Sequence, residues 1–304
     1  MKKDKKHILV PVDFQEPSIK AAKYAVYLAK KLDAEIFLLH ILETQSMISK
    51  FFESGNQLVQ ITDQAKGLLQ ELAASLSEMD PSIKIVTRVD RGKRYDIILK
   101  VAQDIDARMI LLGENHEGSE AEKDLGTTVY HVTLKSTVPV LTLKGVAHDF
   151  GQPIVVPLDL ARETKKQLFS ALVYGLNYGA KIYLVSTLIP GVKEKQSLIY
   201  KKMRNAKITL EQNGVECEIK IFEKGKQPSY KQIIEFADEL EASMILLMTH
   251  QEGYNYDNYI GAFAHHLINN SKIPVLSLTS SATNFNFREL FKAVVDPVGI
   301  FFKE

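Results

Sequence analysis

The chain has 304 residues, enough for two ordinary domains, and a composition of 45% hydrophobic and 25% charged residues that is typical of soluble globular proteins. Its 38 basic and 37 acidic residues nearly cancel and are evenly divided along the chain, which argues against a basic nucleic-acid-binding module. The apolar runs are too short to span a membrane, and the single cysteine, Cys217, excludes an intramolecular disulfide framework and favours a cytoplasmic location.

In the first half of the chain, apolar runs alternate with segments of helical spacing. Most of the runs are continuous, as in strands that are covered on both faces. Helical spacing after Pro17, and again from Ile97 to Ile105, predicts helices between the strands. The predicted strands are Ile8–Val12, Ile36–Ile41, Ile83–Val89, Met109–Leu112 and Val138–Leu143.

The second half repeats the first. The stretch "HILVPVDFQEPSIK" from His7 matches "PIVVPLDLARETKK" from Pro153 without a gap, and "ARMILLG" from Ala107 returns as "ASMILLM" from Ala242. Alternating strands and helices predict an α/β fold of two tandem doubly wound domains, each a five-stranded, mainly parallel sheet flanked by helices. We expect domain 1 at residues 1–147, domain 2 at residues 148–280 and a C-terminal tail at residues 281–304.

Two motifs, each present twice, point to a family. The copies open with "ILVPVD" and "IVVPLD", and they close with "MILLG" or "MILLM", a glycine, and "VPVL" or "IPVL". With these motifs the chain resembles the universal stress protein family in its tandem form, over nearly its whole length apart from the tail. The resemblance implies a Rossmann-like fold of the HUP type.

The loop after the fourth predicted strand decides what the resemblance implies about ligands. Nucleotide-binding members of that family have a glycine at the end of this strand, a second glycine after two residues, and a third with Ser or Thr after nine more. The first copy has Gly113, His116, Gly126 and Thr127 at these positions. Glycine lets the backbone approach a phosphate closely, and the following helix offers unpaired N–H groups. The first copy therefore keeps most of a phosphate loop.

The second copy keeps less of this pattern. It has Met248, Gln251, Gly261 and Ala262 at the corresponding positions, so that only the last glycine is retained. We therefore expect the second site to be degenerate. Its aspartate, Asp159, is interpreted as a turn residue.

Charge is a second argument about the ligand. The segment Gly113–Thr127 carries five carboxylates and one lysine. A triphosphate is unfavourable beside such a loop unless cations compensate for its charge. We therefore expect AMP, ADP or adenosine to be repelled less strongly than ATP. Mg²⁺ would accompany ATP. The basic turn "RGKR", Arg91–Arg94, could supply cations near the mouth of the site.

The resemblance also implies individual roles in the first copy. Asp13 would bond a ribose or adenine edge, for which a turn or helix cap is the alternative, and His116 could meet a phosphate. Ile41 and Leu112 would pack beside the base. The predicted binding residues are Pro11, Val12, Asp13, Ile41, Leu112, Gly113, His116, Gly126, Thr127 and Thr128.

No spacing of residues predicts a catalytic or metal site, and His131, His265 and His266 are interpreted as solvated or core histidines. The resulting hypothesis is a non-catalytic regulatory module of the stress response that binds an adenine nucleotide in its first half. The alternatives are an interaction protein without a nucleotide and a weak ATPase. The resemblance also implies that the last strands, at Val140–Leu143 and Val275–Leu278, join the two halves, and it leaves open whether whole chains form homodimers.

Overall fold

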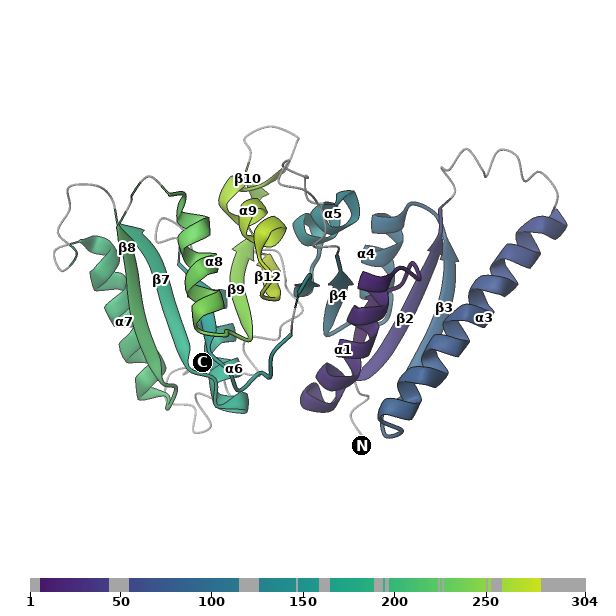
Figure 1. Ribbon diagram of the computed structural model, residues 1–304, viewed down its shortest axis with the longest axis horizontal. Coiled ribbons are helices and arrows are strands. Elements are labelled where there is room, and N and C mark those ends of the chain that lie inside the picture. The colour runs from purple at the N-terminus through teal and green to yellow at the C-terminus, as the bar shows by residue number, and fades with distance from the viewer. Residues whose placement is uncertain are drawn as a thin grey trace, which may run out of the picture. The chain divides into compact units, whose positions relative to one another are not determined.

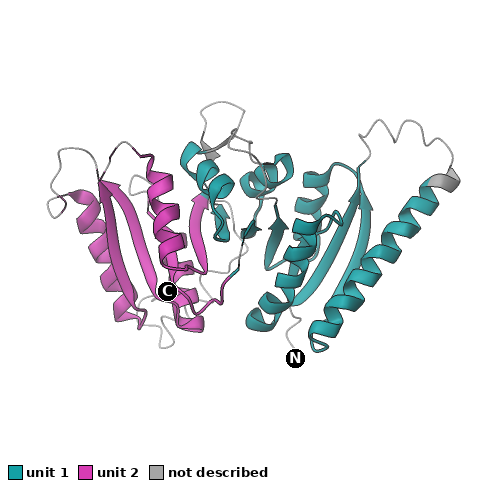
Figure 2. Cartoon of the chain, viewed as in Figure 1, with its two compact units in different colours: residues 1–147, 249–279 teal, residues 148–248, 280–304 magenta. Residues whose placement is uncertain are grey.

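The computed structural model describes residues 6–43, 55–114, 126–145, 147–158, 165–188, 194, 197–223, 225, 227–249, 251–252 and 259–279. They form an α/β fold (Figure 1) that divides into two compact units (Figure 2). The first unit takes its described residues from 1–147 and 249–279, and the second from 148–248. The predicted site residue His116, the turn residue Asp159 and the tail at 281–304 lie outside the described residues.

The sheet of the first unit has the strand order β3-β2-β1-β4-β5-β12. Strands β1 to β5 all pair in parallel, which confirms the doubly wound, five-stranded sheet that was predicted for the first repeat. The central residues of β1, β2, β4 and β5 are buried, as the continuous apolar runs required, whereas those of the edge strand β3 are half-buried. The bounds are β1 His7–Pro11, β2 Glu35–Leu42, β3 Ile85–Arg91, β4 Met109–Gly113, β5 Val140–Leu143 and β12 Val275–Thr279.

The helices of the first unit cover this sheet. Pro17 lies in the first turn of α1, as predicted, because its fixed φ and missing N–H suit that position. Helix α1 buries Ala21, Ala22 and Ala25 completely, and such small side chains let a helix lie close to a sheet. No helix in the described ranges has the length and apolar character needed to cross a bilayer. The bounds are α1 Glu16–Leu32, α3 Gly55–Met79, α4 Arg94–Asp104, α5 Thr127–Lys135 and α9 Ala262–Asn270.

Strand β12 comes from the second repeat but lies in the first unit. It runs antiparallel to β5, with Val275 opposite Thr142 and Ser277 opposite Val140. The hydroxyl of Thr279 also donates a 2.6 Å hydrogen bond to the carbonyl of Ser136, just before β5. The apolar edge of β5 is therefore covered by another strand, which prevents pairing with foreign chains.

The four strands of the second unit repeat the order of β1 to β4 in the first. Their order is β9-β6-β7-β8, and the strands pair in parallel. Cys217 is buried at the start of β8. The bounds are β6 Ile154–Pro157, β7 Ile182–Leu188, β8 Cys217–Glu223, β9 Met244–Thr249, α6 Lys165–Tyr178, α7 Leu198–Gln212 and α8 Ser229–Glu239, followed in the chain by the short pair β10 Gln251–Glu252 and β11 Tyr259–Ile260.

Candidate functional site

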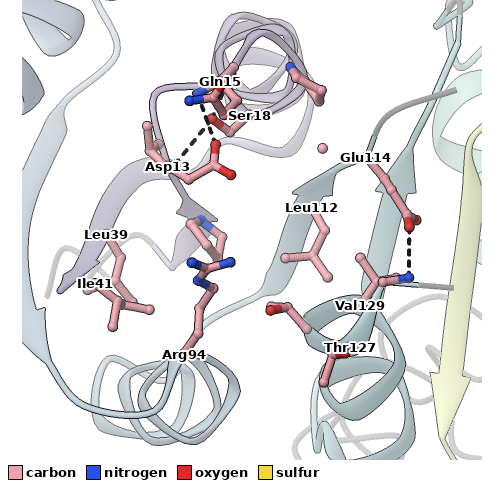
Figure 3. A pocket seen from close by; sticks show the side chains of 16 residues that line it. Asp13, Gln15, Ser18, Leu39, Ile41, Arg94, Leu112, Glu114, Thr127 and Val129 are labelled. Atoms are coloured by element: carbon pink, nitrogen blue, oxygen red, sulfur yellow. Dashed lines mark hydrogen bonds between the residues drawn. The ribbon is translucent and has the colours of Figure 1, made fainter. Parts of the chain in front are cut away.

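A cavity of about 430 Å³ opens at the carboxyl ends of β1 and β4 in the first unit (Figure 3). The strand order reverses between these two strands, and ligands of doubly wound sheets bind at such a switch point. The volume lies within the range of roughly 300–1,000 Å³ that is usual for small-molecule sites. The lining residues are Pro11, Val12, Asp13, Gln15, Pro17, Ser18, Leu39, Ile41, Arg94, Leu112, Gly113, Glu114, Gly126, Thr127, Thr128 and Val129.

The cavity brings together the predicted binding residues that the structure describes. They come from the end of β1, from β2, from the end of β4 and from the start of α5, and their roles toward a ligand stay predictions. His116 is the predicted residue that lies outside the described part of the chain. The residues brought together are Pro11, Val12, Asp13, Ile41, Leu112, Gly113, Gly126, Thr127 and Thr128.

Apolar side chains form part of the cavity lining. Leu39, Ile41, Leu112 and Val129 are all buried, and they come from β2, β4 and α5. Ile41 and Leu112 were predicted beside a base, whereas Leu39 and Val129 were not. Such a surface suits a flat, uncharged ring system more than a charged group.

Asp13 stabilises the turn between β1 and α1. Its Oδ1 accepts a 3.0 Å hydrogen bond from the backbone N–H of Gln15, and its own N–H donates to the Ser18 hydroxyl over 3.3 Å. The turn role that was the alternative for Asp13 is therefore present. The side chain is exposed and also lines the cavity (Figure 3), so the turn and a ligand could both use its carboxylate.

The residue after Asp13 has a strained backbone. Phe14 has a φ of 64°, in the left-handed region that a bulky side chain rarely adopts. Its ring packs on His40 with the ring centroids 4.6 Å apart, and His40 Nδ1 donates a 2.7 Å hydrogen bond to the carbonyl of Val12. These contacts fix the loop that carries Asp13.

The two motif glycines of the first loop, Gly113 and Gly126, have different surroundings. A Cβ atom on Gly113 would lie 2.0 Å from the carbonyl oxygen of Pro17, so the packing of β4 against α1 already requires glycine there. A Cβ on Gly126 would meet only the Oε1 of Glu114, at 3.3 Å. Glycine at 113 therefore has a structural cause that is independent of any ligand.

Three charged side chains line the cavity. Arg94 extends from α4 into it (Figure 3), and its Nη2 lies 3.2 Å from Glu43 Oε2. Glu114 and Asp13 are the two carboxylates. The lining thus carries more negative than positive charge, although the basic turn that contains Arg94 does supply a cation at the site, as the sequence suggested.

Glu114 is held between a backbone amide and a buried lysine. Its Oε1 accepts a 3.1 Å hydrogen bond from the N–H of Gly126, the residue that precedes α5. Its Oε2 lies 3.3 Å from Lys144 Nζ, and only 4% of the Lys144 side chain is exposed. Burial lowers the pKa of the Lys144 ammonium, and the neighbouring Glu114 opposes this by raising it.

Sequence reasoning missed several residues at this site. Glu114 was counted among the acidic residues of its loop, but its contact with Gly126 joins residues that the sequence does not pair. Lys144 follows an apolar strand, and nothing in its position signals an ion pair. The missed lining residues are Gln15, Pro17, Ser18, Leu39, Glu114 and Val129.

The histidines were the residues most suggestive of a metal site. Within the described ranges, no group of three or more His, Cys, Asp or Glu side chains could hold a metal ion. His131 stacks on Tyr95 with the ring centroids 4.2 Å apart, and burial lowers the pKa of its imidazole, helped by Lys135 and Lys93. This histidine is part of an aromatic cluster.

The second repeat has a different residue at its corresponding strand ends. Gln167 is 1% exposed, and its Nε2 donates to the carbonyls of Pro157, in β6, and Leu246, in β9, over 2.7 and 2.8 Å. The repeat alignment places Gln167 opposite Ala21, so the first repeat has no such amide. Gln167 therefore bridges the two strands that flank the switch point of the second unit. Met248, at the first lost glycine, is buried in β9.

The sequence model of the Universal stress protein family matches the chain twice, at residues 5–144 and 151–278. Universal stress protein MJ0531 of Methanocaldococcus jannaschii is 26% identical over 141 residues, which are 46% of this chain and 82% of that protein. Universal stress protein YxiE of Bacillus subtilis is 26% identical over 144 residues, which are 45% of this chain and 97% of that protein.

Among solved structures, a universal stress protein from Archaeoglobus fulgidus covers 91% of this chain and 99% of its own, with a TM-score of 0.76 and 18% identity, which shows a shared fold. The two family matches cover both repeats and nearly all described residues. The chain therefore belongs to the universal stress protein family and carries two copies of its domain in tandem.

Proposed function

We propose that this protein is a non-catalytic regulatory module of the stress response, and that the cavity of its first repeat binds an adenine nucleoside or nucleotide. One observation carries the proposal: residues that the family motif marks, although far apart in the sequence, line one cavity at a topological switch point. The second repeat is proposed to be degenerate, because Gln167 bridges the strands that flank its switch point.

The chemistry of the lining supports this class of ligand. The buried side chains of Leu39, Ile41 and Leu112 offer an apolar surface for a base. The carboxylate of Asp13 can accept hydrogen bonds from ribose hydroxyls or from an exocyclic amine. Arg94 is the lining cation that could meet a phosphate.

Magnesium would accompany ATP, and it is usually held by one or two carboxylates together with phosphate oxygens. Glu114 Oε1 accepts a hydrogen bond from a backbone amide and its Oε2 faces a lysine, so Asp13 is the lining carboxylate that would hold the ion. Bound there, Mg²⁺ would neutralise part of the phosphate charge.

The test is calorimetric titration of the full chain with adenosine, AMP, ADP and ATP. We expect one ligand per chain, and we expect Asp13→Ala to weaken binding on the order of tenfold or more through loss of hydrogen bonds to a carboxylate. Asp13→Asn keeps an oxygen for the Gln15 amide, so it separates the charge from the turn. Asp159→Ala, the matched change in the second repeat, should leave the affinity unchanged. The absence of a binding signal with all four ligands would refute the proposal.

A second candidate function is that of an interaction protein of the same fold without a nucleotide. It is favoured by Gly113, whose close contact with Pro17 accounts for that glycine without a ligand, and by Glu114, whose carboxylate already accepts the hydrogen bond of the Gly126 N–H. The titration above decides between the two. A weak ATPase is the third candidate, and phosphate release no faster than in a buffer blank would exclude it.

We also propose that the two repeats are joined through their last strands, with domain 1 at residues 1–147 and domain 2 at residues 148–280. The antiparallel register of β5 and β12 supports this, because it is the pairing expected of two copies related by a two-fold axis. A cytoplasmic location is proposed from the single, free and buried Cys217.

A further inference from the structure

The amino end of α5 already has an anion beside it. The N–H of Gly126 donates a 3.1 Å hydrogen bond to Glu114 Oε1, and Gly126 is the residue that caps α5. The first N–H groups of a helix are unpaired and carry a partial positive charge, so they attract a phosphate or a carboxylate. At this place the protein supplies the carboxylate from its own chain.

The carboxylate of Glu114 is fixed from several sides. Its second oxygen lies 3.3 Å from Lys144 Nζ, which in turn donates a 2.8 Å hydrogen bond to the carbonyl of Asn269, at the end of α9. The backbone N–H of Glu114 donates to the carbonyl of Leu143, in β5, over 2.9 Å. The side chain of Glu114 is 16% exposed and that of Lys144 is 4% exposed. A phosphate that entered here would have to displace a half-buried carboxylate that is already paired with Lys144.

Lys144 is paired with Glu114, and the other charged groups in the described lining add no net positive charge for a phosphate. Asp13 adds a second carboxylate, and the guanidinium of Arg94 is shared with Glu43 at 3.2 Å. The buried apolar side chains of the lining, by contrast, can pack against an uncharged ring without the desolvation penalty that a charged group would incur. The cavity is therefore better suited to a ligand that has no phosphate at the α5 end.

We infer that Glu114 is a specificity-determining residue of the first-repeat cavity: its carboxylate occupies the amino end of α5 and selects nucleosides over nucleotides. The ligand class is an uncharged purine nucleoside such as adenosine. This inference rests on the proposed function and narrows it, because the family motif alone would place a phosphate at the same helix end.

The experiment is calorimetric titration of the full chain with adenosine and AMP at one fixed ionic strength, for the wild type and for Glu114→Gln. The glutamine keeps an oxygen for the Gly126 amide but removes the charge and leaves Lys144 available to a phosphate. We expect the wild type to bind adenosine at least about tenfold more tightly than AMP, since like charges in a partly buried site repel strongly. In Glu114→Gln the AMP affinity should rise by about tenfold, with adenosine little changed.

Glu35→Gln is the matched control, because Glu35 is also 16% exposed and lies 2.9 Å from a lysine, Lys84, but begins β2 at the end away from the cavity. This variant should leave the ratio of the adenosine affinity to the AMP affinity near that of the wild type. If the lone lysine prevents Glu114→Gln from folding, the double variant Glu114→Gln with Lys144→Met removes both charges at similar volume, and its ratio should also fall.

Two outcomes would overturn the inference while leaving the proposed function intact: wild-type protein that binds AMP as tightly as adenosine, or a ratio that Glu114→Gln does not change. Binding of neither ligand by any variant would instead overturn the proposed function, and this inference with it.

Discussion

Gly113 illustrates how one residue can satisfy a family motif for a reason of packing. The carbonyl of Pro17, in the first turn of α1, lies so close that any Cβ at 113 would overlap it. Glu114, the next residue, then turns its carboxylate toward Gly126. The motif glycine therefore allows the close approach of β4 to α1, which is a structural role independent of any ligand.

Replacing this glycine should damage the fold as well as the site. We expect Gly113→Ala to lower the free energy of unfolding by about 1–3 kcal/mol, because the new methyl group must push α1 away. Gly67→Ala is the control, since a Cβ there meets nothing within 4 Å in the middle of α3, and alanine favours a helix. Urea denaturation measures both; equal stabilities of Gly113→Ala and wild type would show that the contact is not rigid.

The ends of the strands distinguish the two repeats. In the first unit, β1 and β4 leave a cavity beside α1 and α5, whereas in the second unit Gln167 of α6 links β6 and β9. The amide donates to the carbonyl of Pro157, at the end of β6, and to that of Leu246, within β9. A buried glutamine in this position therefore stabilises the second unit at the place where the first can hold a ligand.

The contribution of the two Gln167 hydrogen bonds to stability can be measured without a change in side-chain volume. Gln167→Met keeps a similar size but removes the two donated hydrogen bonds, so we expect a loss of about 1–3 kcal/mol in the free energy of unfolding. Gln167→Glu is not a suitable comparison, because it would bury a charge. Urea denaturation of Gln167→Met that coincides with that of the wild type would contradict the role assigned to the amide.

Pairing of β5 with β12 makes the first unit depend on residues from both halves of the chain. Val140 lies opposite Ser277, and the hydroxyl of Thr279 bonds to Ser136. A chain cut after residue 147 would expose the apolar edge of β5, which is a template for pairing with another strand. We expect residues 1–147 to self-associate in analytical ultracentrifugation. A stable monomer of that fragment would show that β12 is not needed to cover the edge.

The sequence predicted much of this architecture but less of the site's chemistry. Local apolar runs and the repeat predicted the strands of the first unit and their parallel pairing. Pro17 predicted the start of α1. The contacts of Glu114 with Lys144, and of Gln167 with two carbonyls, were not predictable, since they depend on side chains that meet only after distant strands have paired. Motif spacing identifies which residues gather at a strand end, but it does not determine their hydrogen-bond partners.

The central claim is that the first-repeat cavity, and not the second repeat, holds an adenine nucleoside. A crystal structure of the full chain with adenosine tests it most directly. The predicted result is one adenosine per chain, with its base beside Ile41 and Leu112, its ribose at Asp13, and Glu114 still bonded to Gly126. An empty first-repeat cavity in crystals whose adenosine is bound elsewhere would contradict the account.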